Sequence, residues 1–140
     1  MATVLFVCYN NSARSLMAES IFNAHAAERH MDARAESAGL LGVGAVHPMV
    51  LRCIEELGVP VEGLKPKQVT KQMVEEADTI VGFGGINSEH TPIKFAVTEL
   101  WPTLNPSGVA YGALCELRDE ISRSVDDLLD RLTAESSLRS

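Results

Sequence analysis

Four short apolar runs alternate with helix-like segments along this chain, and this alternation limits the folds that it can adopt. The runs are rich in β-branched, aromatic or small residues and end in polar or glycine clusters, as buried strands do. They cover residues 3–7, 35–38, 79–83 and, with a weaker pattern, 95–97. Strands separated by helices favour parallel pairing, right-handed crossovers and helices on both faces of one sheet. The sequence therefore predicts an α/β fold.

The segments between these runs place apolar residues at intervals of three and four, which is the pattern of amphipathic helices. The predicted helices cover residues 15–30, 48–57, 70–77 and 114–132. Pro48 suits a first helical turn, Gly58 suits the position after a helix end, and Thr70 suits an N-cap. Two prolines and two glycines within residues 99–112 predict a long loop before the last helix.

The length of 140 residues and the hydrophobic content of 46% fit a single domain with one core, and they exclude wholesale disorder. We expect the domain to cover residues 1–135 and residues 136–140 to form a frayed tail. The first residues lack the pattern of a signal peptide, and no apolar stretch reaches the roughly 20 residues of a membrane span. A cytoplasmic location is therefore expected.

The net charge is −7, with 19 acidic and 12 basic side chains. A general nucleic-acid or membrane-surface binder needs a basic face, so the charge argues against both classes of partner. An anionic ligand is compatible with this charge where a local site concentrates positive potential. The four histidines and three cysteines show no metal-ligand spacing, so no metal centre is expected.

The most informative stretch joins the first predicted strand to the first predicted helix. It reads Cys8-Tyr9-Asn10-Asn11-Ser12-Ala13-Arg14-Ser15. Ligands of doubly wound folds bind beyond the carboxyl ends of the strands. A short loop that enters a helix there directs backbone N–H groups and the helix dipole toward a tetrahedral oxyanion. Arg14 adds a planar fork of donors for two of the oxyanion's oxygens.

Cys8 begins this loop, so the positive field there favours its thiolate, and Ser15 is placed to donate a hydrogen bond to the sulfur. These groups together predict a sulfur nucleophile aimed at the centre of a bound oxyanion. A lone cysteine at a strand end is more often a small buried hydrophobe, and an arginine at a helix start is often simply solvated. A cysteine followed after five residues by Arg-Ser, at a strand-to-helix turn, weighs against both interpretations.

With these residues the chain resembles the low-molecular-weight protein tyrosine phosphatase superfamily, which includes the thiol-dependent arsenate reductases. The resemblance covers most of the chain, and its middle motifs are closer to the arsenate reductase branch. The matching motifs are Val4-Leu5-Phe6-Val7-Cys8, Asn11, Arg14-Ser15, Met17-Ala18-Glu19, Ser37-Ala38-Gly39, His47-Pro48, Pro66-Lys67-Gln68-Val69-Thr70 and the loop near Trp101 and Pro106.

The resemblance implies a four-stranded parallel sheet flanked by helices, and it implies roles for the loop residues. Cys8 would be the nucleophile, Arg14 the clamp on the oxyanion and Ser15 the support of the thiolate. Asn11 would hold a strained turn, which suits asparagine because it tolerates left-handed backbone. The substrate-binding residues implied are Tyr9, Asn10, Asn11, Ser12, Ala13 and Arg14.

The chain departs from the family at its general acid. That residue is an Asp before a Pro in the late loop, and the matching position here holds Asn105 before Pro106. An amide cannot protonate a leaving oxygen, a contribution worth about 10²–10⁴-fold in rate. Asn105 is interpreted either as a plain turn residue or as a tuned binding residue. The nearest acids, Glu99 and Glu116, replace it only if the loop folds unusually.

The second departure concerns redox chemistry. Reductases of the family that resolve internally need further cysteines after the third strand, and residues 82–90 contain none. Cys53 lies on the apolar side of a predicted helix and Cys115 lies beside Leu114, so core packing is the preferred interpretation of both. We therefore expect no tightly bound cofactor, and we expect an external low-molecular-weight thiol, or a thiol-redox partner, to resolve an adduct on Cys8.

The sequence supports three hypotheses for function. In the first, the chain is an arsenate reductase-type enzyme whose Cys8 thiolate attacks arsenate. In the second, it is a phosphatase that acts on phosphotyrosine or a small phosphate ester through a phosphocysteine, weakened by Asn105. In the third, it is a non-catalytic protein that binds arsenate, phosphate or sulfate.

Overall fold

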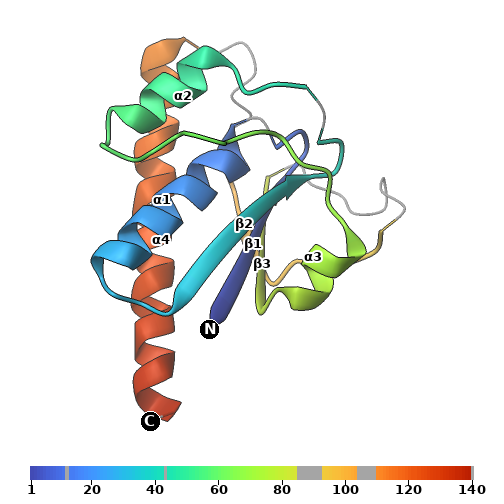
Figure 1. The fold of residues 1–140 in the computed structure, drawn as a ribbon, viewed down its shortest axis with the longest axis vertical. Helices are drawn as coiled ribbons and strands as arrows, with labels where there is room; N and C mark the ends of the chain where they lie inside the picture. The colour runs from blue at the N-terminus through green and yellow to red at the C-terminus, as the bar shows by residue number, and fades with distance from the viewer. Residues whose placement is uncertain (12, 43, 85–92, 104–109, 140) are drawn as a thin grey trace.

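The computed structural model describes the chain except residues 12, 43, 85–92, 104–109 and 140, and for residues 136–139 it describes the backbone alone. Four strands form one parallel sheet in the spatial order β2-β1-β3-β4 (Figure 1). The strands are β1 (Ala2–Cys8), β2 (Ala33–Gly39), β3 (Thr79–Phe83) and β4 (Glu99–Trp101). The predicted α/β fold with a four-stranded parallel sheet is confirmed.

The helices cover both faces of this sheet, as predicted. They are α1 (Arg14–Glu28), α2 (Pro48–Glu55), α3 (Lys71–Glu76) and α4 (Tyr111–Arg139). Helices α1 and α4 lie against one face, with α2 packed beside them, and α3 lies on the opposite face (Figure 1). Side chains of β1 point alternately to the two faces of the sheet, so they belong to two separate hydrophobic clusters. Those of Val4, Phe6 and Cys8 face α1 and α4, whereas those of Leu5 and Val7 face α3.

Three local signals in the sequence identify helix ends correctly. Pro48 is the first residue of α2, and the Nδ1 atom of the preceding His47 accepts a hydrogen bond from the Met49 backbone at 3.1 Å. Thr70 caps α3 through its Oγ1 atom, which accepts from the backbone of Met73 at 3.2 Å. Gly58 follows α2 with a φ of 76°, in the left-handed region that favours glycine after a helix.

The fourth strand does not lie where the sequence predicts it. Residues 95–97 are outside the sheet, and the apolar character of Phe95 reflects packing against the cluster below α3. The strand β4 covers Glu99–Trp101 and pairs with β3. The sequence does not indicate this strand because its first residue, Glu99, is charged. The partner of the Glu99 carboxylate, Arg131, lies far along the chain on α4.

The predicted loop of residues 99–112 is shortened at both ends. Strand β4 takes its first three residues, and α4 begins at Tyr111, so that Gly112 is helical. A Cβ atom added at Gly112 would meet nothing within 4 Å, so neither packing nor an unusual backbone angle demands a glycine there. The glycine weakens the helix slightly and does not end it.

The last helix continues to Arg139. The division into a domain of residues 1–135 and a frayed tail of residues 136–140 stays a prediction. Among the helices that the structure describes, none is long and apolar enough to cross a membrane.

Glu99 ties β4 to α4. Its carboxylate oxygens accept hydrogen bonds from the Arg131 guanidinium at 2.7 and 2.9 Å, and one of them also accepts from the Trp101 indole at 2.7 Å. The bonds from Arg131 lower the pKa of Glu99. A carboxyl with a lowered pKa stabilises the fold above its unfolded value of about 4.3, and this contribution is lost as the pH falls through the folded value.

We expect Glu99→Gln to lower the free energy of unfolding at pH 7 by about 1 kcal/mol, as for a bidentate pair that is partly exposed. The difference from the wild type should shrink as the pH falls below about 4 and through the lowered pKa of Glu99, where its carboxylate takes up a proton. Urea unfolding across this pH range measures both effects. Glu75→Gln, which removes an exposed pair with Lys71, is the control and should change stability by under about 0.5 kcal/mol. A difference that does not change with pH would contradict the prediction.

Candidate active site

Cys8 is the last residue of β1 and opens the loop of residues 8–15, here called the Cys8 loop. Its side chain points to the face covered by α1 and α4, and it is 3% exposed. The carboxyl edge of a parallel sheet is where ligands of such folds bind. The thiol therefore lies at the base of the loop that the sequence singles out.

Asn11 holds the Cys8 loop in a left-handed turn. Its φ is 54°, and its side chain is fully buried. The side-chain amide acts as both donor and acceptor. Its Nδ2 atom donates to the Oγ atom of Ser15 at 2.6 Å, and its Oδ1 atom accepts from the backbone N–H of Lys67 at 2.8 Å. These two bonds offset the roughly 1–2 kcal/mol that a left-handed backbone costs an L-residue.

Ser15 links Asn11 to the thiol. Its Oγ atom lies 2.8 Å from the Sγ atom of Cys8 while it accepts the hydrogen bond from Asn11. Because the amide hydrogen occupies a lone pair of the hydroxyl oxygen, the hydroxyl hydrogen is free to point at the sulfur. The hydrogen-bond chain from Asn11 through Ser15 thus directs a donor at Cys8, which stabilises negative charge on the sulfur.

Arg14 is the first residue of α1 and is 6% exposed. Its Nη1 atom donates to the carbonyl oxygen of Gly84 at 3.0 Å, and its guanidinium carbon lies 5.8 Å from the ring centroid of Phe83. Burial lowers the pKa of Arg14, and the charge of Cys8 acts in the opposite direction. The bond to Gly84 uses one of five guanidinium N–H donors, which leaves donors for an oxyanion.

The start of α1 is open to a ligand. Ala13 is its N-cap, and among the described residues no side chain caps the helix and no acidic side chain lies in its first turn. The first amides of a helix have no intrahelical partner, and the helix dipole is positive there. This end of α1 therefore suits an anion.

The Cys8 loop rests on the end of β2. The backbone N–H groups of Leu40 and Leu41 donate to the carbonyl oxygens of Cys8 and Tyr9 at 3.1 and 2.8 Å. A Cβ atom added at Gly39 would lie 2.8 Å from backbone atoms of the loop, which is closer than real contacts allow. Glycine is therefore required for β2 to approach the loop so closely.

A second support comes from the segment before α3. The backbone of Lys67 binds Asn11, and its Nζ atom lies 3.2 Å from the carboxylate of Glu19, which also accepts from the Ser37 hydroxyl at 2.9 Å. The sequence places Glu19, Ser37 and Lys67 in the matching motifs but does not indicate a role for them. One signal could have identified them. Glu19 and Lys67 have opposite charges, and they lie in motifs that a parallel sheet brings to the same edge.

The other predicted loop residues differ in their placement. Tyr9 is 46% exposed and Asn10 is also exposed, so both lie at the surface, whereas Ala13 is buried at the helix start. Ser12 lies outside the described residues. So does Asn105, the position that matches the family's general acid.

The alternative acids and the other cysteines are placed as follows. Glu99 is bound to Arg131, and Glu116 is exposed on α4. Cys53 is fully buried in the core, as predicted. Cys115 is only half-buried at the edge of that core, where its thiol donates to the carboxylate of Glu56, the residue after α2, at 3.7 Å.

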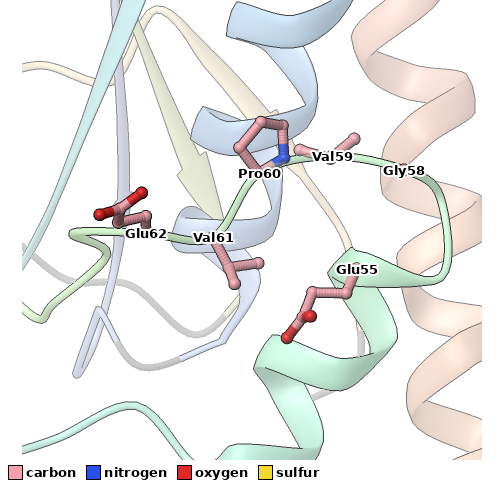
Figure 2. A pocket seen from close by; sticks show the side chains of 6 residues that line it. All are labelled: Glu55, Gly58, Val59, Pro60, Val61 and Glu62. Carbon is pink, nitrogen blue, oxygen red and sulfur yellow. The ribbon is translucent and has the colours of Figure 1, made fainter.

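A surface pocket of about 430 Å³ lies beside the end of α2 (Figure 2). Its lining residues are Glu55, Gly58, Val59, Pro60, Val61 and Glu62. None of the described residues of the Cys8 loop lines this pocket. Because two of its side chains are carboxylates, it does not suit an oxyanion.

A comparison with family models shows the relationship of this chain to known proteins. The model described as low molecular weight phosphotyrosine protein phosphatase matches residues 3–138. The chain belongs to this family. The resemblance inferred from the motifs is confirmed.

Some relatives within the low molecular weight phosphatase family are named as arsenate reductases and others as phosphatases. A "Glutaredoxin arsenate reductase" of Synechocystis is 24% identical over 135 residues, which cover 95% of this chain and 100% of the relative. The "Low molecular weight protein-tyrosine-phosphatase YfkJ" of Bacillus subtilis is 34% identical over 92 residues, 62% of this chain and 59% of the relative. The solved structure of an arsenate reductase from Archaeoglobus fulgidus superposes with a TM-score of 0.74 and 31% identity, covering 91% of this chain and 98% of that one.

We expect Gly39→Ala to lower the free energy of unfolding by about 1–3 kcal/mol, because the added Cβ overlaps backbone atoms of the Cys8 loop. Urea unfolding measures this loss. Gly112→Ala adds the same methyl group in open space on α4 and should stabilise the protein by up to about 1 kcal/mol. Equal stabilities of the two variants would show that the loop does not need the close approach of β2.

Proposed function

We propose that this protein is an arsenate reductase-type enzyme with the Cys8 thiolate as its nucleophile. The observation that supports this best is the arrangement of three electropositive groups at the sulfur. These groups are the Ser15 hydroxyl, the Arg14 guanidinium and the open N-terminus of α1. A tetrahedral oxyanion is the ligand class that such groups bind, and a thiolate beneath it is placed to attack its central atom.

In the first step, the Cys8 thiolate attacks the arsenic of bound arsenate. A sulfur–arsenic bond forms, and one oxygen leaves as hydroxide, which solvent protonates. Arg14 and the amides at the start of α1 hold the remaining oxygens and stabilise their charge. Ser15 orients the sulfur before the attack by donating its hydroxyl hydrogen to it.

In the second step, an external thiol attacks the Cys8 sulfur. A disulfide forms between the two sulfurs, and the electron pair of the sulfur–arsenic bond leaves with arsenic, which is reduced from the pentavalent to the trivalent state. A second external thiol then reduces the mixed disulfide and restores Cys8. In total, two thiols are oxidised to one disulfide for each arsenate that is reduced.

Two observations favour an external thiol. Cys53 is fully buried, and Cys115 bonds to the carboxylate of Glu56, so among the described residues neither thiol contacts the Cys8 loop. The Synechocystis relative has a name that pairs arsenate reduction with glutaredoxin. We propose that the partner is a low-molecular-weight thiol or a thiol-redox protein, in a reducing compartment such as the cytoplasm, where Cys8 stays reduced.

The test measures glutathione consumption and arsenite formation by the purified protein with added arsenate, with and without glutaredoxin. The wild type should consume two thiols for each arsenite formed. Cys8→Ser should fall to the background rate, and Arg14→Lys should lose about 10²-fold, because a lysine cannot form the planar fork.

The matched control is Arg34→Lys, an exposed pair with Glu36 on β2, and it should keep the wild-type rate. Thiol consumption that does not depend on arsenate, or that Cys8→Ser retains, would overturn the proposed reaction.

A phosphatase acting on phosphotyrosine or a small phosphate ester is the second candidate function. The family match and the name of the YfkJ relative favour it. The nucleophile would be the same, with phosphorus in place of arsenic, but the leaving oxygen needs a proton that Asn105 cannot supply.

We expect slow hydrolysis of an aryl phosphate with a good leaving group, and for poor leaving groups a gain in Asn105→Asp of up to about 10²–10⁴-fold. Asn105→Ala is the control that removes the amide without adding an acid, and it should show no gain. If calorimetry detects phosphate binding but neither arsenate nor any ester is turned over, both enzymatic proposals fail and oxyanion binding alone is supported.

A further inference from the structure

Two further thiols meet where α2 packs on α4, in a cluster that the proposed reaction does not use. Cys53 lies on α2 and Cys115 lies on α4. The Cys53 thiol donates to the carbonyl oxygen of Leu114 at 3.8 Å, so it rests against the backbone next to Cys115. The Sγ atom of Cys115 lies 3.7 Å from a carboxylate oxygen of Glu56, three residues after Cys53. Both thiols therefore lie where α2 packs on α4.

Polar side chains of α4 and of Glu56, the residue after α2, fix this contact. The Nη1 atom of Arg118 donates to the carbonyl oxygen of Cys53 at 2.8 Å and to the carboxylate of Glu56 at 3.0 Å. Glu56 also accepts from the Tyr111 hydroxyl at 2.7 Å and from the Cys115 thiol at 3.7 Å. Because these bonds join α4 to Cys53 and to the end of α2, the positions of the two thiols are fixed by the helix contact and not by one loose side chain.

The two thiols differ in their access to solvent. Cys53 is fully buried, and burial, with a smaller effect of Cys115, raises the pKa of Cys53 to about 12. Cys115 is half-buried. The reactive form of a cysteine is its thiolate. A reagent from solution therefore meets Cys115 first, and Cys53 reacts only with what is already bound to its neighbour.

We propose that Cys53 and Cys115 form an intramolecular disulfide when the protein meets a small disulfide such as oxidised glutathione, independently of Cys8. The Cys115 thiolate attacks one sulfur of the small disulfide, which forms a mixed disulfide and releases one glutathione thiolate. The Cys53 sulfur then attacks the Cys115 sulfur and releases the second glutathione as a thiolate, which takes up the proton that Cys53 loses. Two protein thiols are thus oxidised, and one oxidised glutathione is reduced to two glutathione molecules.

This disulfide joins positions in the chain that are far apart, and it fixes α2 to α4. A long closed loop restricts the unfolded chain more than the folded one. We therefore expect the melting temperature to rise by roughly 5 °C or more on oxidation and to return when the disulfide is reduced. The reduction of arsenate would itself release a small disulfide, but the pairing of the thiols does not rest on that activity.

Peptide mapping tests the proposal directly. Trypsin cleaves after lysine and arginine and does not cleave before proline, so the three cysteines fall on separate peptides, residues 1–14, 53–67 and 95–118. The native protein is incubated with oxidised glutathione, alkylated and digested without reduction. We expect residues 53–67 linked to residues 95–118, with the mass of both peptides less two hydrogens, and loss of this species after reduction.

The Cys8→Ser variant should form the same link, which separates this test from that of the proposed reaction. A link from residues 1–14 to either other peptide would overturn the proposal. Glutathione retained on Cys115 of the wild type, with Cys53 alkylated after unfolding, would also overturn it.

Two variants separate the steps. In Cys53→Ala the reaction should stop at the mixed disulfide, so that residues 95–118 carry one glutathione. Cys115→Ser should gain neither the link nor the rise in melting temperature. This second change lies at a half-buried position, so it keeps the test decisive even if the buried Cys53→Ala variant does not fold.

Discussion

The side-chain amide of Asn11 is the interaction on which the site depends. A left-handed residue in a short loop is stable only where its backbone is held, and Asn11 is held from two sides, by Ser15 and by Lys67. One bond orients the hydroxyl that faces Cys8, and the other ties the loop to the segment before α3. Gly39 lets β2 approach the same turn. The surroundings of the sulfur are therefore set by the sheet, a helix and a distant segment together.

Arg14 shows how burial and charge are balanced at this loop. Removing a guanidinium from water is costly, and the carbonyl of Gly84 and the ring of Phe83 offset part of that cost. The open end of α1 adds positive potential at the same place, although the whole chain carries a net charge of −7. Positive groups that lie close together repel one another unless a negative charge neutralises them. A doubly charged oxyanion neutralises them and a neutral ligand does not, which explains how an acidic protein can select an anion.

The sequence predicts those parts of the fold that depend on neighbouring residues. Strand β3 has the predicted bounds because its apolar run is continuous, and the Cys8 loop is recognisable because its groups lie within eight residues. Strand β4 is missed because the Glu99 carboxylate is matched only by a residue on α4. The support of the loop by Lys67 is missed for the same reason. Cys53 and Cys115 are each predicted as core residues, but periodicity within two helices does not tell which of their positions meet.

Arsenate reduction and phosphate-ester hydrolysis share the attack of a thiolate on a tetrahedral centre, so the geometry around Cys8 serves both. They differ in what must follow. Hydrolysis requires a proton for the leaving oxygen and then an activated water, and a carboxyl group performs both tasks, first as acid and then as base, where this chain has Asn105. Reduction requires instead a second thiol that attacks the sulfur, and that step needs no carboxyl group. Because Cys53 and Cys115 lie in a separate contact between α2 and α4, the proposed reduction takes its second thiol from outside. The amide at position 105 and the placement of the cysteines therefore favour the same reaction.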